Sequence, residues 1–334
     1  MSFMECVSVS SSRADVVGRY VEFVAGRCRP NTVIATESDL RVFFSVIDRP
    51  PAEVCTADVF EFIAAQRRGP GDGRVVRLAD GEAGLAARTI KRRLASVSGL
   101  FNYLVLTGEM AANPVPRGMA TRRTGAGGRA TGSPLIRTPR TLPRVLDPAE
   151  VIALLGAARR WRDRAMFEAM VLGGLRCCEV VGLRLEDLRP TERRVFIADG
   201  KGGHQRLVPL SAQFFASVSN YLSGERPADA ASSQLFVVLK GARRGGALSI
   251  DGLEQIVRGA KTRAELEHAT CHQLRHTCLT RLREAGMALE AIQAQAGHRS
   301  IESTRVYLHL ADGWLADEYH RAAGLIDATA GAIQ

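Results

Sequence analysis

Two arginines, a lysine, three histidines and a tyrosine lie in three separated segments of the second half of the chain. Arg176 belongs to the first segment and Lys201 to the second. The third segment, from residue 272 to residue 309, holds the other members of the set: His272, Arg275, His276, His298 and Tyr307. Guanidinium groups match the non-bridging oxygens of a phosphate, and a histidine can add a hydrogen bond to them. The set therefore suits attack on a phosphodiester.

The other residue types have defined uses in the same chemistry. A tyrosine hydroxyl acts as a nucleophile once a nearby group removes its proton. A lysine can protonate the leaving oxygen, particularly where surrounding cations lower its pKa. A nuclease that works through two metal ions needs a cluster of carboxylates, and none accompanies this set. We therefore expect a reaction that uses no metal and no cofactor.

Taken singly, each residue has an ordinary structural explanation. Arg176 could pair with a carboxylate at a helix end, Lys201 could be a turn lysine, and Tyr307 could belong to a core. His272 and His276 could bind zinc, but no glutamate completes a His-Glu-x-x-His pattern. The prediction depends on the joint order and spacing of the residues.

Local sequence signals indicate how the set is positioned. His272, Arg275 and His276 stand at positions i, i+3 and i+4 and so share one face of a predicted helix. Gly297 is predicted to end a helix, because glycine is common just after the last helical turn, so the next residue, His298, is expected at a turn.

The second half is predicted to be mainly helical with a small antiparallel sheet. It begins at Asp147, where an N-cap aspartate is followed by Pro148 and Glu150, a strong helix start. Strands are expected on either side of the turn Gly200-Lys201-Gly202-Gly203. The expected helices cover residues 148–158, 162–173, 177–183, 250–264, 272–285, 288–295 and 300–310, and the strands residues 194–198 and 206–210.

The first half, residues 13–115, is predicted to be a bundle of four helices because apolar residues recur at helical spacing. A short helix over residues 56–66 has Val59, Phe60 and Ile63 as its expected apolar face. The last helix of the bundle carries the candidate DNA contacts Thr89, Lys91, Arg92 and Arg93. A helical domain with solvated cations is the alternative.

Residues 116–146 differ in composition from the rest of the chain. They contain seven arginines with no Asp or Glu, among Gly, Thr and Pro. Such a segment cannot bury a core, so it predicts a flexible basic linker. Arg122 and Arg123 are candidate phosphate contacts, since each such contact adds salt-dependent affinity. A basic tether that contacts no DNA is the alternative.

Composition narrows the class of protein. The chain of 334 residues has a formal net charge of +10, which favours a polyanionic partner. Seven cysteines, an odd number without a Cys-x-x-Cys pair, predict neither a disulfide framework nor a structural zinc site. No apolar run is long enough to span a membrane and no signal peptide is evident, so we expect a cytoplasmic protein.

In its order of motifs, the second half resembles the catalytic domain of the tyrosine recombinase (phage integrase) family. The resembling motifs are Gly174-Leu175-Arg176 with Glu179, Leu183 and Asp187; Lys201 with Arg206 and Val208-Pro209-Leu210; His272-Gln273-Leu274-Arg275-His276-Thr277; and Gly297-His298 with Thr304, Tyr307 and His309. The first half is similar, more weakly, to the core-binding domain of that family. His204 departs from the family pattern, which commonly has lysine there.

The resemblance implies a fold that is mainly α with a small antiparallel sheet, arranged as a two-domain clamp around duplex DNA. Its parts are a helical core-binding domain (13–115), a linker (116–146), a catalytic domain (147–310) and a C-terminal tail that docks in cis or in trans (311–334). A homotetramer on two specific DNA sites is implied as well. Arg206, in the hairpin, is counted among the DNA contacts.

The resemblance also implies a role for each catalytic residue. Tyr307 attacks the scissile phosphate, forms a 3′-phosphotyrosyl bond and frees a 5′-hydroxyl. The other roles are these: Arg176 and Arg275 hold the non-bridging oxygens, His298 adds a donor, Lys201 protonates the leaving oxygen, and His272 assists proton removal from Tyr307. The covalent bond conserves the phosphoester, so no ATP is required.

Two alternatives stay open. A type IB topoisomerase uses a similar catalytic set, and a DNA-binding regulator could have lost catalysis. Among recombinases, phage integration, transposon movement, integron cassette exchange and chromosome-dimer resolution share the same chemistry. The motifs do not predict the target DNA sequence, which depends on contacts to base edges and on DNA deformability.

Overall fold

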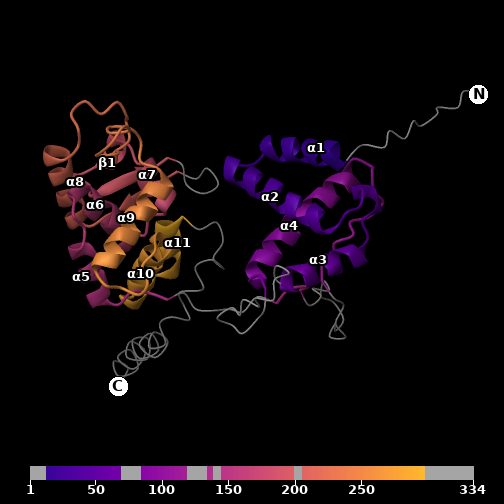
Figure 1. The fold of residues 1–334 in the computed structure, drawn as a ribbon. Coiled ribbons are helices and arrows are strands. Elements are labelled where there is room, and N and C mark those ends of the chain that lie inside the picture. Colours follow the sequence, from indigo (N-terminus) through magenta and orange to yellow (C-terminus); the bar gives the residue numbers. More distant parts are fainter. Residues whose placement is uncertain (1–12, 69–83, 119–133, 138–143, 199–204, 298–334) are drawn as a thin grey trace, which may run out of the picture. The chain divides into compact units, whose positions relative to one another are not determined.

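The structure is a computed structural model that describes residues 13–68, 84–118, 134–137, 144–198 and 205–297 (Figure 1). The chain divides into two compact units, Met1–Arg140 and Thr141–Gln334, each with its own hydrophobic core. Several predicted features lie outside the described residues: Lys201, His298, Tyr307, Arg122, Arg123, the helix over residues 300–310 and the tail over residues 311–334.

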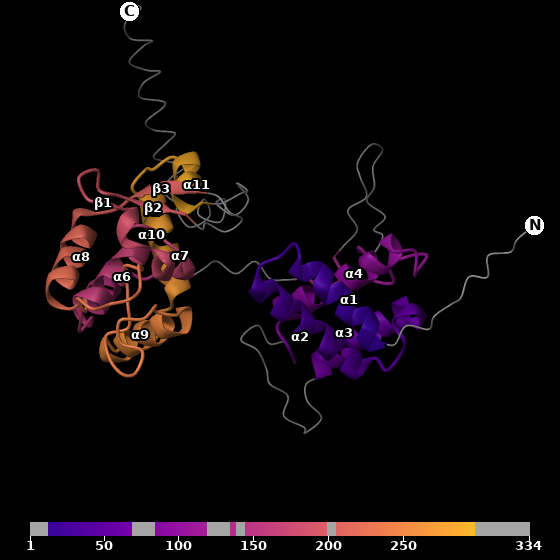
Figure 2. The same ribbon diagram turned by 90° about the horizontal axis from the view of Figure 1, so that it is seen from above.

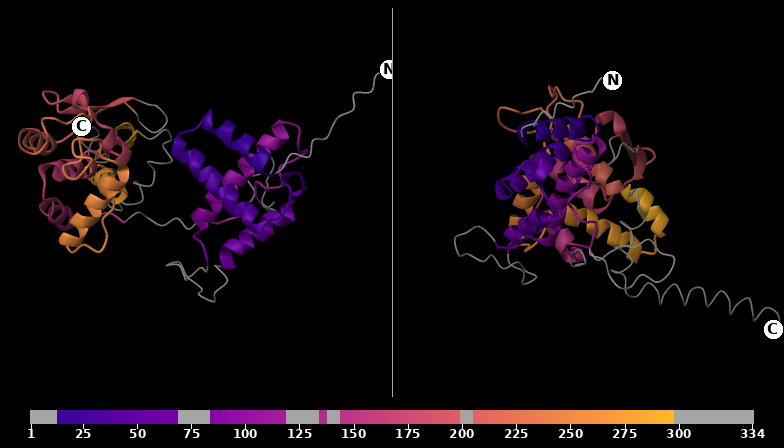
Figure 3. Two further views of the ribbon diagram at one scale, coloured as in Figure 1. Left: turned by 45° about the horizontal axis from the view of Figure 1, so that its top comes forward. Right: turned by 90° about the vertical axis from the view of Figure 1, so that its right-hand side faces the viewer.

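The described part of the first unit contains the four expected helices, shown from two further sides in Figure 3. They are α1 (Arg13–Ala25), α2 (Pro30–Val46), α3 (Thr56–Arg68) and α4 (Ala87–Leu106), with a short 3-10 turn η1 (Pro51–Glu53). Helix α2 packs against α1, α3 and α4. The rings of Phe43, Phe62 and Phe101 meet edge to face at the centre, with centroids 5.0 Å apart for Phe43 and Phe62.

The predicted apolar face of α3 was wrong at one position. Val59 and Phe62 are completely buried, whereas Phe60 is 49% exposed. Residues three apart on a helix share a face, and adjacent residues point about 100° apart. Val59 and Phe62 therefore point into the core together, while Phe60 is turned toward solvent.

One stretch of the predicted linker packs on the first unit. Ile136, which lies between two basic stretches, is buried in the core of this unit together with Val115. At the C-terminal end of the segment, Leu146 is buried in the core of the second unit. Its N–H donates to Thr277 Oγ1 at 2.9 Å. Apolar residues in the C-terminal half of the basic segment thus contribute to the two cores.

The second unit is mainly helical with a small sheet, as expected. Its helices are α5 (Pro148–Gly156), α6 (Trp161–Val171), α7 (Cys177–Gly182), α8 (Ala212–Gly224), α9 (Ile250–Arg263), α10 (Cys271–Glu284) and α11 (Leu289–Ala296), with a 3-10 turn η2 (Leu185–Asp187). The antiparallel sheet has the order β1 (Leu188–Arg189), β2 (Arg194–Ile197), β3 (Arg206–Pro209), with Val195 opposite Val208. The strands β2 and β3 confirm the predicted hairpin.

The start of α5 shows the predicted capping box. Asp147 Oδ1 accepts from the N–H of Glu150 at 2.8 Å, and Glu150 Oε2 accepts from the N–H of Asp147 at 2.9 Å. Such a cap is worth about 1 kcal/mol of helix stability.

Helix α6 forms the centre of the second unit and packs against both α8 and α10 (Figure 2). Its residues Ala165, Phe167 and Met170 are completely buried. Helix α8 is an element that the sequence analysis missed, although Phe214, Val218 and Tyr221 are buried at helical spacing. None of the described helices has the length and apolar character needed to cross a lipid bilayer.

Candidate active site

Glu179 on α7 is a buried carboxylate held by the guanidinium of Arg206 on β3. Its side chain is fully buried. Arg206 Nη1 donates to Oε1 at 3.0 Å, and Nη2 donates to Oε2 at 2.9 Å. Burial would raise the pKa of Glu179, but hydrogen bonds from Arg206 and from the Arg176 N–H hold that pKa below its ordinary value. Glu179 is therefore an anion at neutral pH.

Arg176 is positioned by the same carboxylate. Its backbone N–H, at the N-cap of α7, donates to Glu179 Oε2 at 2.9 Å. In its side chain, Nη1 donates to Glu179 Oε1 at 2.8 Å and Nη2 donates to the Gly297 carbonyl at 3.1 Å. The guanidinium is thus held between the start of α7 and the end of α11.

Arg275 on α10 approaches Glu179 from a third element. Its Nη1 donates to the Gly174 carbonyl at 2.5 Å and its Nη2 to the Ala296 carbonyl at 2.7 Å. Nη1 also lies 3.9 Å from Glu179 Oε2. Within the part of the site that the structure describes, the three guanidinium charges of Arg176, Arg206 and Arg275 face the one carboxylate charge of Glu179, an excess of two. An excess of positive charge at a partly enclosed site favours an anion there.

Two glycines supply the carbonyls that orient these arginines. Gly174 and Gly297 both have left-handed backbones, with φ of +69° and +59°. A Cβ at Gly297 would stand 2.8 Å from Arg206 Cζ, and one at Gly174 would stand 3.0 Å from Leu279 Cδ2. Glycine is required at both positions by its freedom at positive φ and by the close neighbours.

His272 and His276 form a hydrogen-bonded pair on one face of α10, as their spacing predicted. Their Nε2 atoms are 2.7 Å apart, and the two rings are nearly perpendicular. Burial, together with the charges of His272 and Arg275, lowers the pKa of His276 to about 4. His276 is therefore neutral at pH 7, and the two rings share one proton across the hydrogen bond.

Gln295 is a structural member of the site that the sequence analysis missed. Its buried amide Nε2 donates to the Gly173 carbonyl at 2.8 Å and to the Pro209 carbonyl at 3.3 Å. Its backbone carbonyl accepts from Arg206 Nε at 3.3 Å. Gln295 thus connects α11 to the first arginine motif and to β3. A lone glutamine carries no signal for such a role, because all of these partners are distant in sequence.

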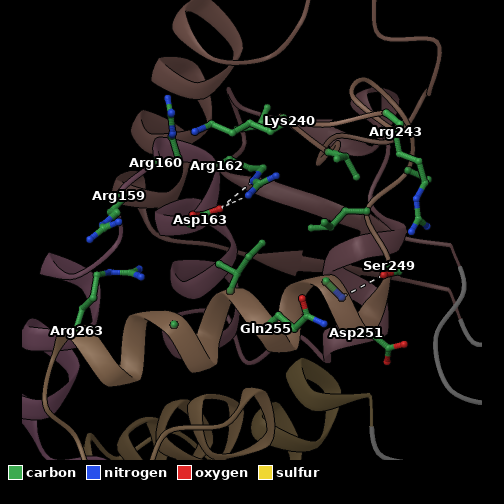
Figure 4. Close-up of a pocket in the computed structure, with 18 residues that line it drawn as sticks. Arg159, Arg160, Arg162, Asp163, Lys240, Arg243, Ser249, Asp251, Gln255 and Arg263 are labelled. Atoms are coloured by element: carbon green, nitrogen blue, oxygen red, sulfur yellow. Dashed lines mark hydrogen bonds and ion pairs between the residues drawn. The ribbon is translucent and has the colours of Figure 1, made fainter.

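A cation-lined cavity of about 1020 Å³ lies in the same unit (Figure 4). It is bordered by the start of α6, the segment after Val237, and α9. Its charged residues are the cations Arg159, Arg160, Arg162, Lys240, Arg243 and Arg263 and the carboxylates Asp163 and Asp251.

Only part of this positive charge is compensated within the described residues. Arg162 donates from Nε and Nη2 to Asp163 Oδ1 and from Nη1 to the Val237 carbonyl. Arg263 donates from Nε to a neutral acceptor, the Ala157 carbonyl. This cavity could not be predicted from the sequence, because its cations come from segments that only the fold brings together.

The predicted DNA contacts on α4 have different surroundings. Arg92 Nη1 donates to Oδ2 of the buried Asp39 at 2.5 Å. Arg93 donates to the side chain of Gln66, and its Nε is 3.9 Å from Asp39 Oδ1. Lys91 is exposed and Thr89 is half-buried. Arg92 and Arg93 therefore lie where α4 meets α2 and α3, in contact with Asp39 and Gln66.

Of the six predicted catalytic residues, the structure describes Arg176, His272 and Arg275. Arg176 and Arg275 share Glu179, which connects α7 to α10. His272 lies one helical turn before Arg275 on α10.

The chain is similar to known proteins over most of its length. Residues 144–313 match the Phage integrase family. A tyrosine recombinase XerC of Vibrio atlanticus is 35% identical over 246 residues, which cover 72% of this chain and 73% of the relative. A tyrosine recombinase XerD of Listeria monocytogenes is 29% identical over 297 residues, or 86% and 91% of the two chains.

Two solved structures share the fold at low sequence identity. A Tn1549 transposon integrase in complex with circular intermediate DNA has a TM-score of 0.63 at 19% identity, covering 89% of this chain and 95% of the other. A lambda integrase dimer bound to a COC′ core site has a TM-score of 0.61 at 17% identity, covering 87% and 93%. These likenesses concern the fold, which several functions can share.

Proposed function

This chain belongs to the phage integrase family of tyrosine recombinases, and on that premise we propose how its residues carry out the reaction. It is a site-specific DNA recombinase that cleaves and rejoins DNA strands. We propose that Tyr307 attacks the scissile phosphate, forms a 3′-phosphotyrosyl bond and frees a 5′-hydroxyl. A 5′-hydroxyl of the partner strand then reverses the step.

One observation supports the phosphate-binding part of this proposal above all others. Arg176 and Arg275, from helices far apart in the sequence, both contact the carboxylate of Glu179. A carboxylate shared in this way sets the spacing of the two guanidinium groups before any phosphate arrives. Donors held in place in advance stabilise developing negative charge without having to reorganise. We therefore assign the non-bridging oxygens to Arg176 and Arg275.

The remaining roles follow from the chemistry of the residue types. We assign to Lys201 the protonation of the leaving 5′-oxygen and to His298 a further hydrogen bond to the phosphate. To His272, whose partner His276 is neutral at pH 7, we assign help in moving the proton of the Tyr307 hydroxyl. The covalent intermediate keeps the phosphoester bond energy, so the proposed reaction needs neither ATP nor a metal ion.

We propose double-stranded DNA as the partner, held by cationic side chains on both units. In the second unit, the cation-lined cavity offers Arg159, Arg160, Lys240 and Arg243 for backbone phosphates. Elsewhere the candidates are Thr89, Lys91, Arg92 and Arg93 on α4, and Arg122 and Arg123. For Arg206, whose side chain is 12% exposed and bonded to Glu179, we propose a positioning role.

The assembly and its location are proposed from the family as well. A homotetramer on two DNA sites would use residues 13–115 and 147–310 as the two DNA-binding domains, joined by the segment 116–146, with residues 311–334 as a docking tail. A cytoplasmic location fits the cysteines of the described residues, which are free thiols.

The test of this function is capture of DNA on the protein. Fragmented DNA from the source organism is incubated with wild-type protein and with Tyr307→Phe, and covalent adducts are isolated under denaturing conditions and sequenced. Recovery of one recurrent sequence by wild type alone supports the proposal. Equal recovery by both proteins, or by neither, contradicts the role of Tyr307. Relaxation of plasmids that lack the recovered sequence would instead favour topoisomerase activity.

A further inference from the structure

At the C-terminal end of α11, three successive backbone carbonyls each accept a hydrogen bond from a different arginine of the site. The pairs are Gln295 O with Arg206 Nε at 3.3 Å, Ala296 O with Arg275 Nη2 at 2.7 Å, and Gly297 O with Arg176 Nη2 at 3.1 Å. The arginines belong to three different elements, β3, α10 and the N-cap of α7. One helix end thus contacts all three described guanidinium groups that pair with Glu179.

The end of a helix is suited to hold guanidinium groups. The last carbonyls of a helix have no partner within it, and they carry the negative end of the helix dipole. In α11 the carbonyls of Gln293 and Ala294 accept from the N–H of Gly297, whose backbone is left-handed. The next three carbonyls accept from the arginines. The place of this helix end therefore affects where three positive charges stand.

The side chain of Gln295 connects this helix end to two neighbouring segments. Its amide Nε2 donates to the carbonyl of Gly173, between α6 and α7, at 2.8 Å. The same nitrogen donates to the carbonyl of Pro209, the last residue of β3, at 3.3 Å. Gln295 is only 7% exposed, so water has little access to these hydrogen bonds. One residue thus fixes the helix end with its side chain and orients Arg206 with its backbone.

The apolar contacts of α11 are made with α10. Ile292 and Ala296 are fully buried and form a small cluster with Leu279 of α10. This cluster is separate from the main core of the second unit. Apolar packing therefore holds α11 against α10, whereas the amide of Gln295 connects α11 to β3 and to the segment before α7.

We propose that Gln295 is a positioning residue for strand cleavage: its amide fixes the end of α11 and so places the carbonyls that orient the three arginines. The effect on cleavage rests on the proposed function, whereas the effect on the arginines does not. His298, to which we assign a further hydrogen bond to the phosphate, directly follows Gly297 in the sequence. The same helix end therefore leads into a fourth member of the proposed phosphate site.

Loss of the amide should slow the chemical step more than it weakens binding. A displacement of about 1 Å in a catalytic geometry can cost about 100-fold in rate. Gln295→Met keeps the length of the side chain but has no N–H to donate, and we expect it to form the phosphotyrosyl adduct at least about tenfold more slowly at saturating DNA. Its affinity for DNA should stay within about twofold of wild type, because binding is spread over many phosphate contacts.

The first measurement is adduct formation by the full-length protein on the captured DNA site, with affinity measured separately by fluorescence anisotropy. The matched control is Asp147→Ala, which breaks the capping box of α5 and so destabilises the same unit at a distance from these carbonyls. Circular dichroism and urea denaturation show that the variants are folded and how stable they are. If Gln295→Met does not fold, Gln295→Asn replaces it, because its amide is drawn back by about 1.5 Å.

The second measurement follows the Arg206 Nε–H by NMR of the ¹⁵N-labelled full-length protein without DNA. In wild type this group donates to the Gln295 carbonyl and its side chain is 12% exposed, so its exchange with solvent should be slow. Arg206→Lys lacks the group and identifies the signal. We expect a shifted signal and faster exchange in Gln295→Met, and an unchanged signal in Asp147→Ala.

The outcomes separate the proposal from general destabilisation. Slow adduct formation with near-normal affinity and a shifted Arg206 signal, in the Gln295 variant alone, support it. Normal adduct formation by that variant at saturating DNA overturns it, and so does equal slowing in Asp147→Ala. An unchanged Arg206 signal overturns the route through the helix end. If wild type forms no adduct on any DNA, the proposed function fails, while the Arg206 signal still decides whether Gln295 orients that arginine.

Discussion

Arg206 donates from both of its terminal nitrogens to the two carboxylate oxygens of Glu179, at 3.0 Å and 2.9 Å, and so joins the hairpin to α7, whose N-cap is Arg176. The planar guanidinium of Arg206 presents two N–H donors whose spacing matches the two oxygens of a carboxylate. Because Glu179 in turn holds Arg176 and approaches Arg275, one ion-paired cluster determines where the two proposed phosphate-binding arginines stand.

Replacing Glu179 with glutamine should destabilise the second unit strongly at neutral pH. The variant keeps the shape of the side chain but leaves three buried or half-buried guanidinium groups without their anion. Removing one partner of a buried ion pair costs about 3–5 kcal/mol of unfolding free energy. Urea denaturation of wild type and Glu179→Gln at pH 7 measures this difference. Equal unfolding free energies would show that the cluster contributes no net stability.

The same pair of proteins also gives a pH dependence with a defined sign. The pKa of Glu179 is lowered in the folded protein from an ordinary value of 4.5. Its stabilising contribution is therefore complete above about pH 4.5 and is lost as the pH falls through the lower folded value. The stability difference between wild type and Glu179→Gln should shrink as the pH is lowered below 4.5. A difference that grows with acid would contradict the assigned direction.

Replacing Arg206 with lysine tests whether Arg206 acts through Glu179 or on DNA. Lysine keeps the charge but loses the two-pronged contact, so we expect lower stability, impaired adduct formation and an unchanged salt dependence of DNA binding. Lys91→Ala, on the exposed side of α4, is the comparison that should reduce the salt dependence. A second variant, Arg206→Gln, removes the charge as well and should lower the stability without changing the salt slope. Unchanged stability with a smaller salt slope in Arg206→Gln would support the direct DNA contact that the sequence suggested.

Most of the fold could be predicted from the sequence, because helix caps, strand alternation and helical spacing are local signals. The capping box at Asp147, the hairpin strands and the positions of Arg176 and Arg275 follow from caps, alternation and spacing. Phe60 was misplaced because Phe60 and Phe62 are two residues apart on α3 and point to different sides of the helix, and Phe62 is the one that enters the core. The paired hydrogen bonds from Arg206 to Glu179, and those from the Gln295 amide to the Gly173 and Pro209 carbonyls, connect segments that are distant in sequence. Such contacts leave no pattern in a single sequence.

His276 should remain neutral well into the acidic range. Burial lowers its pKa to about 4 from an ordinary 6.5, so between these values the unfolded chain binds a proton that the folded chain does not. Stability should therefore fall as the pH drops from 6.5 to 4, and His276→Gln should show a weaker fall. NMR titration of the histidine ring signals measures the pKa directly. Protonation of His276 near pH 6.5 would contradict the assignment.

Replacing Lys240 and Arg243 together with alanine should weaken binding to any duplex DNA. Each lost phosphate contact lowers the slope of log affinity against log salt by about 0.9. The matched control is Arg244→Ala, because Arg244 is paired with Asp229 at 3.2 Å. Fluorescence anisotropy with a labelled duplex, over a range of salt concentrations, gives the slopes. Equal slopes for the double variant and wild type would show that the cavity is not part of the DNA-binding surface.

The cavity variant should also separate binding from chemistry. At a protein concentration that saturates the DNA, Lys240→Ala with Arg243→Ala should still form the covalent adduct, because neither residue belongs to the proposed catalytic set. Arg176→Ala should bind DNA nearly as wild type does and form at least about 100-fold less adduct, since it loses a donor aimed at the developing negative charge. If Arg176→Ala bound DNA weakly but formed adduct normally at saturating protein, Arg176 would be a DNA-binding residue and would not belong to the catalytic set.

If Tyr307 is the nucleophile, it becomes covalently joined to DNA, and mass spectrometry of the trapped adduct tests this most directly. Wild-type protein is incubated with its captured DNA site, digested with trypsin and nuclease, and searched for a phosphonucleotide on the peptide that contains Tyr307. The modification is predicted on Tyr307 in wild type and should be absent from Tyr307→Phe. A nucleotide attached to another residue, or an adduct that persists in Tyr307→Phe, would contradict the account.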